Sequence, residues 1–133
     1  MIRFLTIVLA ILFLALPLRA QEQEIQGVID DQIKAFRADD FETAFTYASP
    51  IIRMMFQTPE RFGEMVRDGY PMVHRPRSYV FEELRELRGS KLQNVLIEAQ
   101  DGYYYIAEYD MVLTEQGWKI RGVRIFRTEG VGA

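Results

Sequence analysis

The sequence contains one histidine, His74, and imidazole is the side chain best suited to move a proton near neutral pH. It stands in a proline-rich segment beside Tyr70, Arg75 and Arg77. If the protein were an isomerase or dehydratase, His74 would carry the proton and a tyrosine would donate a hydrogen bond. No carboxylate stands at a spacing that would orient the ring, so we expect His74 to pack or to face solvent. Catalysis by His74 is kept as the alternative.

A second set of side chains is suited to binding rather than to reaction. It consists of six aromatic residues, Phe36, Phe45, Tyr103, Tyr105, Tyr109 and Trp118. We expect them to line a cavity that takes a small apolar or amphipathic ligand. The simpler explanation of these aromatic residues is that they belong to a sheet face packed on helices, where the buried tyrosine hydroxyls have hydrogen-bond partners. The leading hypothesis is a non-enzymatic domain that binds such a ligand or a protein partner.

Several classes of site are excluded by composition. The chain has no cysteine and one histidine, so its scattered carboxylates do not make a metal site of known spacing. It has no phosphate-binding glycine loop and no nucleophile-elbow serine, and we expect no cofactor. The net charge is −3, which argues against nucleic acid as a partner.

The first twenty residues have the pattern of a bacterial signal peptide. Arg3 precedes a largely apolar run from Phe4 to Leu16, and Ala20 closes the segment. The run is shorter than the roughly 20 residues that span a membrane, so cleavage is expected, with retention as an anchor as the alternative. Residues 21–133 would then form one periplasmic or secreted domain without membrane attachment and with a net charge of −5.

Helices are predicted in the first half of this domain. An amphipathic helix from Gln23 has apolar residues at helical spacing, namely Ile25, Val28, Ile29, Ile33 and Phe36. Asp39 with Glu42 predicts a capping box for a second helix. Ser49-Pro50 and Thr58-Pro59 predict two further helix starts. Gly69 is expected to end the last of them in the left-handed conformation, and residues 70–76 are expected to be irregular.

Four strands are predicted in the second half, over residues 78–83, 92–99, 103–113 and 118–126. The hydrophobic register favours a hairpin that pairs Ala99 with Tyr103 and turns the odd-numbered residues of the third strand toward the helices. Alternation breaks in the last strand, which predicts a bulge near Gly122. Asp110 is expected to face Arg121 across the sheet as an ion pair.

The outer face of this sheet is expected to carry Glu108 and Asp110 together with apolar Tyr104, Ile106 and Val112. Such a mixture suits contact with a second copy of the chain, and we predict a homodimer through this face. A structural subunit of the cell envelope, with its own side chains filling the cavity, is a further alternative.

Several segments resemble known families, among them residues 36–45, Ala48-Ser49-Pro50, residues 69–73, residues 109–112 and the ending Gly117-Trp118-Lys119-Ile120. The chain resembles the nuclear transport factor 2-like superfamily, which includes ketosteroid isomerases and polyketide cyclases. Within it, residues 25–127 are similar to an uncharacterised exported bacterial family, domain of unknown function 4864. The resemblance implies an α+β fold in which N-terminal helices pack on a curved antiparallel meander, forming a cone.

The resemblance does not indicate which function this chain has, because the superfamily includes isomerases, dehydratases, ligand-binding proteins and assembly domains with the same fold. Its isomerases hold an aspartate base within the cone. In the register expected for this chain, Asp110 and Glu108 lie outside the cone. Isomerase chemistry is therefore the weaker expectation.

Overall fold

A computed structural model describes residues 18–129, and within them helices precede strands. The elements are α2 (Leu18–Arg37), α3 (Phe41–Thr46), α4 (Pro50–Phe56), α5 (Pro59–Gly69), α6 (Pro71–His74), β1 (Ser78–Leu87), β2 (Ser90–Glu98), β3 (Tyr104–Thr114) and β4 (Gly117–Thr128). The sheet is antiparallel with strand order β1-β2-β3-β4. The predicted α+β class with a meander sheet is confirmed.

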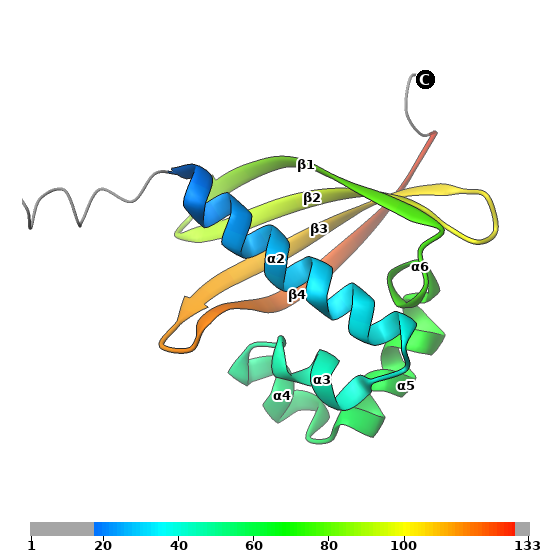
Figure 1. Cartoon of the computed structure of the whole chain (residues 1–133), viewed down its shortest axis with the longest axis horizontal. Helices are drawn as coiled ribbons and strands as arrows, with labels where there is room; N and C mark the ends of the chain where they lie inside the picture. The colour runs from blue at the N-terminus through cyan, green and yellow to red at the C-terminus, as the bar shows by residue number, and fades with distance from the viewer. Residues whose placement is uncertain (1–17, 130–133) are drawn as a thin grey trace, which may run out of the picture.

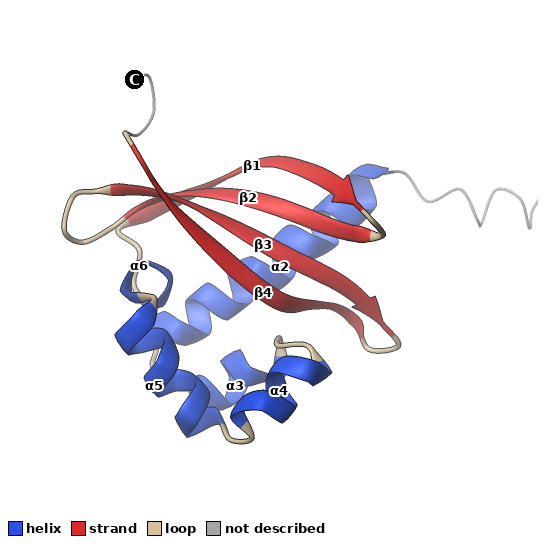
Figure 2. Cartoon of the chain, turned by 180° about the vertical axis from the view of Figure 1, so that it is seen from behind, coloured by secondary structure: helices blue, strands red, loops and turns tan. Residues whose placement is uncertain are grey.

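The helices lie on one side of a twisted sheet (Figures 1 and 2). The long helix α2 crosses one face of the sheet, and the short helices gather near its C-terminal end. Residues 1–17, which hold most of the predicted signal peptide, lie outside the described residues. No helix within residues 18–129 is long and apolar enough to cross a membrane.

Helix α2 forms because its apolar residues recur every three or four positions. Ile25, Ile29, Ile33 and Phe36 are all buried, as the spacing predicted. Lys34 and Arg37 stand in its last turn, where positive charge is favourable beside the exposed carbonyls. The helix therefore offers one continuous apolar face to the sheet.

Two predicted helix ends are wrong. The N-cap of α3 is Asp40, which accepts a hydrogen bond from Thr43 N at 3.2 Å, whereas Asp39 adopts a positive φ of 53°. Gly69 lies within α5 without a positive φ, because Tyr70 ends that helix. The expectation that residues 70–76 are irregular is also wrong for residues 71–74, which form the single turn α6, since a proline at the first helical position needs no hydrogen bond.

The predicted pairing of β2 and β3 is confirmed. Val95 lies opposite Ala107 and Ile97 opposite Tyr105, and Ala99 N donates to Tyr103 O at 2.9 Å. The residues of β3 that face the helices, Ala107, Tyr109 and Met111, are fully buried. The hydrophobic pattern fixed this register because a shift by one residue would expose the whole set.

The predicted bulge in β4 is also confirmed. Asp110 pairs with Gly122 while Met111 pairs with Ile120, so Arg121 is the extra residue. The bulge keeps Ile120 and Val123 on the face that meets the helices. A second bulge, between Phe81 and Leu84 in β1, was not predicted. The buried Gln93 donates to Glu82 O at 2.9 Å beside it.

Candidate functional site

An apolar cleft of about 350 Å³ lies between the short helices and β4. Its lining residues are Gln32, Phe36, Ala48, Ile52, Met55, Phe56, Phe62, Met65, Val66, Tyr70, Val73, Ile120, Gly122 and Val123. They come from α2, α4, α5, α6 and β4 and from the connections between them. None of these side chains carries a charge, so the cleft suits a neutral group.

Helix α4 forms the accessible wall of this cleft. It has no buried residue, and Met55 contributes to the lining while 66% of its surface is exposed. Hydrogen bonds hold the chain to β4 just before α4, where Ser49 N donates to Ile120 O at 2.8 Å. Methionine side chains adapt to different shapes, so this wall can adjust to a ligand.

Phenylalanines form the floor of the cleft. The ring of Phe62 lies 5.8 Å from that of Phe36 and 5.9 Å from that of Phe56, measured between centroids. Phe41 packs behind them, 6.3 Å from Phe36, and the ring of Phe41 leaves no room for a side chain at Gly63. This tight packing of α3 on α5, with Phe36 of α2 against the same rings, gives the cleft a rigid base.

One buried polar side chain, Gln32, lines the cleft. Its amide nitrogen donates to Ala44 O at 3.1 Å, which fixes the orientation of the amide. Among the described residues, this is the one hydrogen bond recorded for the Gln32 side chain, and an amide oxygen can accept a further one.

The six aromatic residues predicted to bind a ligand are not brought together. Phe36 lines the cleft, and the other five are not among its lining residues. Phe45 is buried and packs 5.3 Å from Phe62, and Trp118 packs against the core. Their role in binding stays a prediction.

The three tyrosines lie in different surroundings. Tyr109 is fully buried, its hydroxyl has no hydrogen-bond partner among the described residues, and burial raises its pKa. Tyr103 is about half exposed and lies under the guanidinium of Arg127, 3.6 Å from the ring centroid. The Tyr105 hydroxyl donates to Asp101 Oδ2 at 3.4 Å.

His74 is held by a carboxylate that sequence reasoning missed. Its Nε2 lies 2.8 Å from Asp39 Oδ1, and Arg75 donates to Asp39 Oδ2 at 2.6 Å. An ionised carboxylate only accepts, so Nε2 carries the hydrogen. The expectation that no carboxylate orients the ring is therefore wrong, because the fold joins residues that are 35 positions apart. His74 shares a surface pocket with Tyr105, and catalysis there stays the alternative.

The contact between Asp39 and His74 leads to a prediction about the stability of the fold at low pH. The hydrogen bond from His74, with the charge of Arg75, lowers the pKa of Asp39. Such a carboxylate stabilises the fold above its unfolded pKa of about 4 and loses that contribution as the pH falls further. We expect Asp39→Asn to lower stability at pH 7 and to flatten its pH dependence below about pH 4. Urea unfolding at a series of pH values measures both effects, and Asp68→Asn is the control. If the two variants had the same dependence of unfolding free energy on pH, the contribution assigned to Asp39 would be wrong.

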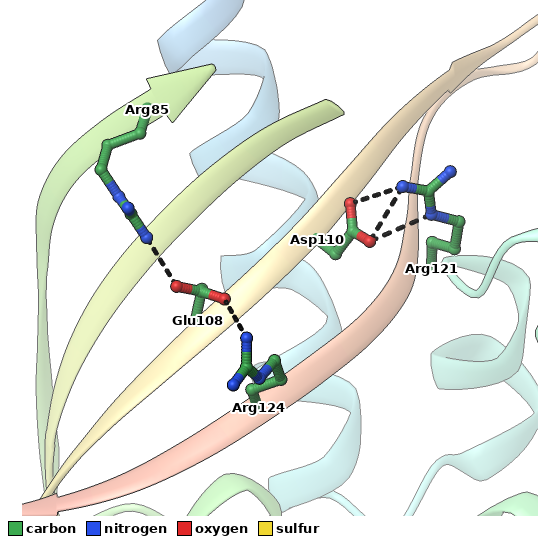
Figure 3. Close-up of polar contacts among 5 residues, drawn as sticks. All are labelled: Arg85, Glu108, Asp110, Arg121 and Arg124. Atoms are coloured by element: carbon green, nitrogen blue, oxygen red, sulfur yellow. Dashed lines mark hydrogen bonds and ion pairs between the residues drawn. The ribbon is translucent and has the colours of Figure 1, made fainter. Parts of the chain in front are cut away.

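The outer sheet face carries the charged residues predicted for it (Figure 3). Glu108 Oε2 lies 2.6 Å from Arg85 Nη2, and Glu108 Oε1 lies 3.7 Å from Arg124 Nη1. Asp110 Oδ2 lies 3.0 Å from Arg121 Nη2. An apolar row also crosses all four strands on this face, namely Val80, Leu96, Ile106 and Phe126. The homodimer through Tyr104, Ile106 and Val112 stays a prediction.

The fold and the cleft together define a class: an α+β domain in which short helices and a curved antiparallel sheet enclose an apolar cleft. The chain belongs to the family described as Domain of unknown function (DUF4864), whose model matches residues 18–133. The family resemblance drawn from the sequence is thus confirmed. No curated protein matches the chain.

Among solved structures, the chain is similar to an NTF-2 like protein of unknown function from Burkholderia xenovorans LB400. The two chains are 12% identical, and the superposition has a TM-score of 0.47. It covers 85% of this chain and 89% of the other.

Proposed function

We propose that this domain is a non-enzymatic binding protein that holds a small, neutral, apolar ligand in the cleft between α4, α5 and β4. The observation that carries the proposal is a cleft of about 350 Å³ whose lining side chains are all uncharged. The exposed side chain of Met55 on α4 bounds this cleft. A ligand there would bury the side chain of Met55 and the faces of Phe56 and Met65. Each buried methylene contributes about 0.8 kcal/mol to such binding.

The lining contains two polar side chains, Gln32 and Tyr70, so the cleft suits a ligand that has one polar group on an apolar body. The amide oxygen of Gln32 can accept a hydrogen bond from that group, and the hydroxyl of Tyr70 can donate or accept one. As part of the same proposal, binding takes place outside the cytoplasm, because residues 1–20 have the pattern of a signal peptide.

The test is binding of a neutral fluorescent probe, N-phenylnaphthylamine, which has an apolar body and one N–H donor. We expect saturable binding to the wild-type protein and about tenfold weaker binding to Met55→Glu, because the probe must then be buried beside a charge. Fluorescence titration gives both dissociation constants.

Met54→Glu is the matched control, since Met54 is exposed on the same helix but is not among the residues that line the cleft. We expect this variant to bind the probe as the wild type does. Absence of saturable binding to the wild type, or equal weakening in both variants, would overturn the proposal.

A further inference from the structure

Helix α4 presents more apolar surface to solvent than its role as a cleft wall needs. Ile51, Met54 and Met55 are 59%, 77% and 66% exposed, although α4 has only seven residues. Ile51 and Met54 are not among the lining residues of the cleft. A contiguous exposed patch of this kind in a soluble domain marks a contact with another surface.

The charges around α4 indicate what that surface is. No Asp or Glu stands between Glu42 and Glu60, although the chain has 19 acidic residues. Arg53 lies on α4 itself, with its guanidinium over the ring of Phe45, and Lys119 of β4 donates a hydrogen bond to Thr46 O at the end of α3, at 2.8 Å. Although the net charge of the chain is −3, these basic side chains would attract an anionic surface locally, on this side of the molecule.

The size of the patch favours a lipid surface over a second protein. A stable protein interface buries about 800 Å² on each partner, which is more than three side chains of one short helix supply. Apolar side chains that enter a bilayer interface need to reach only about 5–10 Å, while basic side chains contact the head groups. The patch on α4 has this composition.

We propose, against the expectation of no membrane attachment drawn from the sequence, that α4 docks the protein on an anionic lipid bilayer and that the ligand of the cleft is a lipid acyl chain taken from that bilayer. The identity of the ligand rests on the function proposed above, whereas the docking does not. Met55 joins the two parts, because it belongs both to the exposed patch and to the cleft lining. An acyl chain could pass along it from the membrane into the cleft without crossing water.

The test is co-sedimentation with vesicles of phosphatidylethanolamine and phosphatidylglycerol. It uses the processed protein that begins at Gln21, which retains every residue of the core. We expect the wild type to bind and the double variant Ile51→Glu, Met54→Glu to bind at least about tenfold more weakly. The control is Val80→Glu, Leu87→Glu, which places two charges on similarly exposed residues of β1 and should sediment as the wild type does.

The two parts fail separately. If the wild type does not bind the vesicles, or if both double variants bind them equally well, docking by α4 is wrong. An α4 variant that binds N-phenylnaphthylamine normally but not vesicles supports docking and leaves the cleft intact. A mass in solution that halves in the α4 variant would assign the patch to a second copy of the chain and overturn the proposal.

Mass spectrometry of protein recovered from vesicles should show a bound acyl lipid, and its absence would remove the acyl chain as the ligand.

Discussion

Replacing Phe36 by alanine is expected to lower the free energy of unfolding by about 3–5 kcal/mol. The side chain is 1% exposed and packs between the rings of Phe41 and Phe62. Alanine there would remove the contacts of this ring with Phe41 and Phe62 and would enlarge the adjoining cleft. A loss of this size is a large part of the total stability of a domain of this length.

Urea unfolding of the wild type and of Phe36→Ala measures this loss. Phe126→Ala is the control, because Phe126 is an aromatic residue that is 43% exposed on the outer sheet face. We expect the control to cost less than about 1 kcal/mol. Similar losses for the two variants would mean that the aromatic cluster does not hold the helices together.

Gly63→Ala is expected to destabilise the protein by about 1–3 kcal/mol, although the same change usually stabilises a helix. A Cβ atom at this position would stand 2.6 Å from Phe41 Cγ and within 2.8 Å of both neighbouring ring carbons. These atoms belong to the base of the ring, so the whole side chain of Phe41 would have to move. That movement would disturb its contacts with Phe36 and with His74.

Two variants separate this clash from the intrinsic preference of the helix. Gly27→Ala in α2 meets no atom within 4 Å and is expected to stabilise by about 0.5–1 kcal/mol. In a Phe41→Ala background, Gly63→Ala should no longer destabilise, because the obstructing ring is gone. Thermal or urea unfolding of the wild type, the three single variants and the Phe41→Ala, Gly63→Ala double variant decides the question, and a stabilising Gly63→Ala would show that the ring moves without cost.

Much of the fold could be predicted because it depends on local patterns. The spacing of Ile25, Ile29 and Ile33 defined α2, and the prolines at positions 50 and 59 marked the starts of α4 and α5. Alternation along β3 and its interruption in β4 gave the sheet register and the bulge at Arg121. These features persist in the folded protein because burial of one face enforces them.

The candidate site could be predicted only in part. Phe36 was identified because it belongs to the apolar face of α2, and it does line the cleft. Met55 and Phe56 were missed, although all residues of α4 except Arg53 are apolar, which is a signal that the helix contacts more than one surface. Tyr103 and Tyr105 were placed in the cavity by alternation alone, but Tyr103 precedes β3, Tyr105 lies at its start, and neither is among the lining residues of the cleft.

By itself, the sequence determined helices α2 to α5 and the four strands, which residues of β3 face the helices, and which charged residues lie on the outer sheet face. Each of these depends on the order of neighbouring side chains. Only the tertiary structure showed that Asp39 accepts a hydrogen bond from His74, that the ring of Phe41 packs directly on Gly63, and that a cleft lined by uncharged side chains lies beside α4. These features join segments far apart in the chain, and their distances follow from how the helices pack on a twisted sheet, which no local pattern encodes.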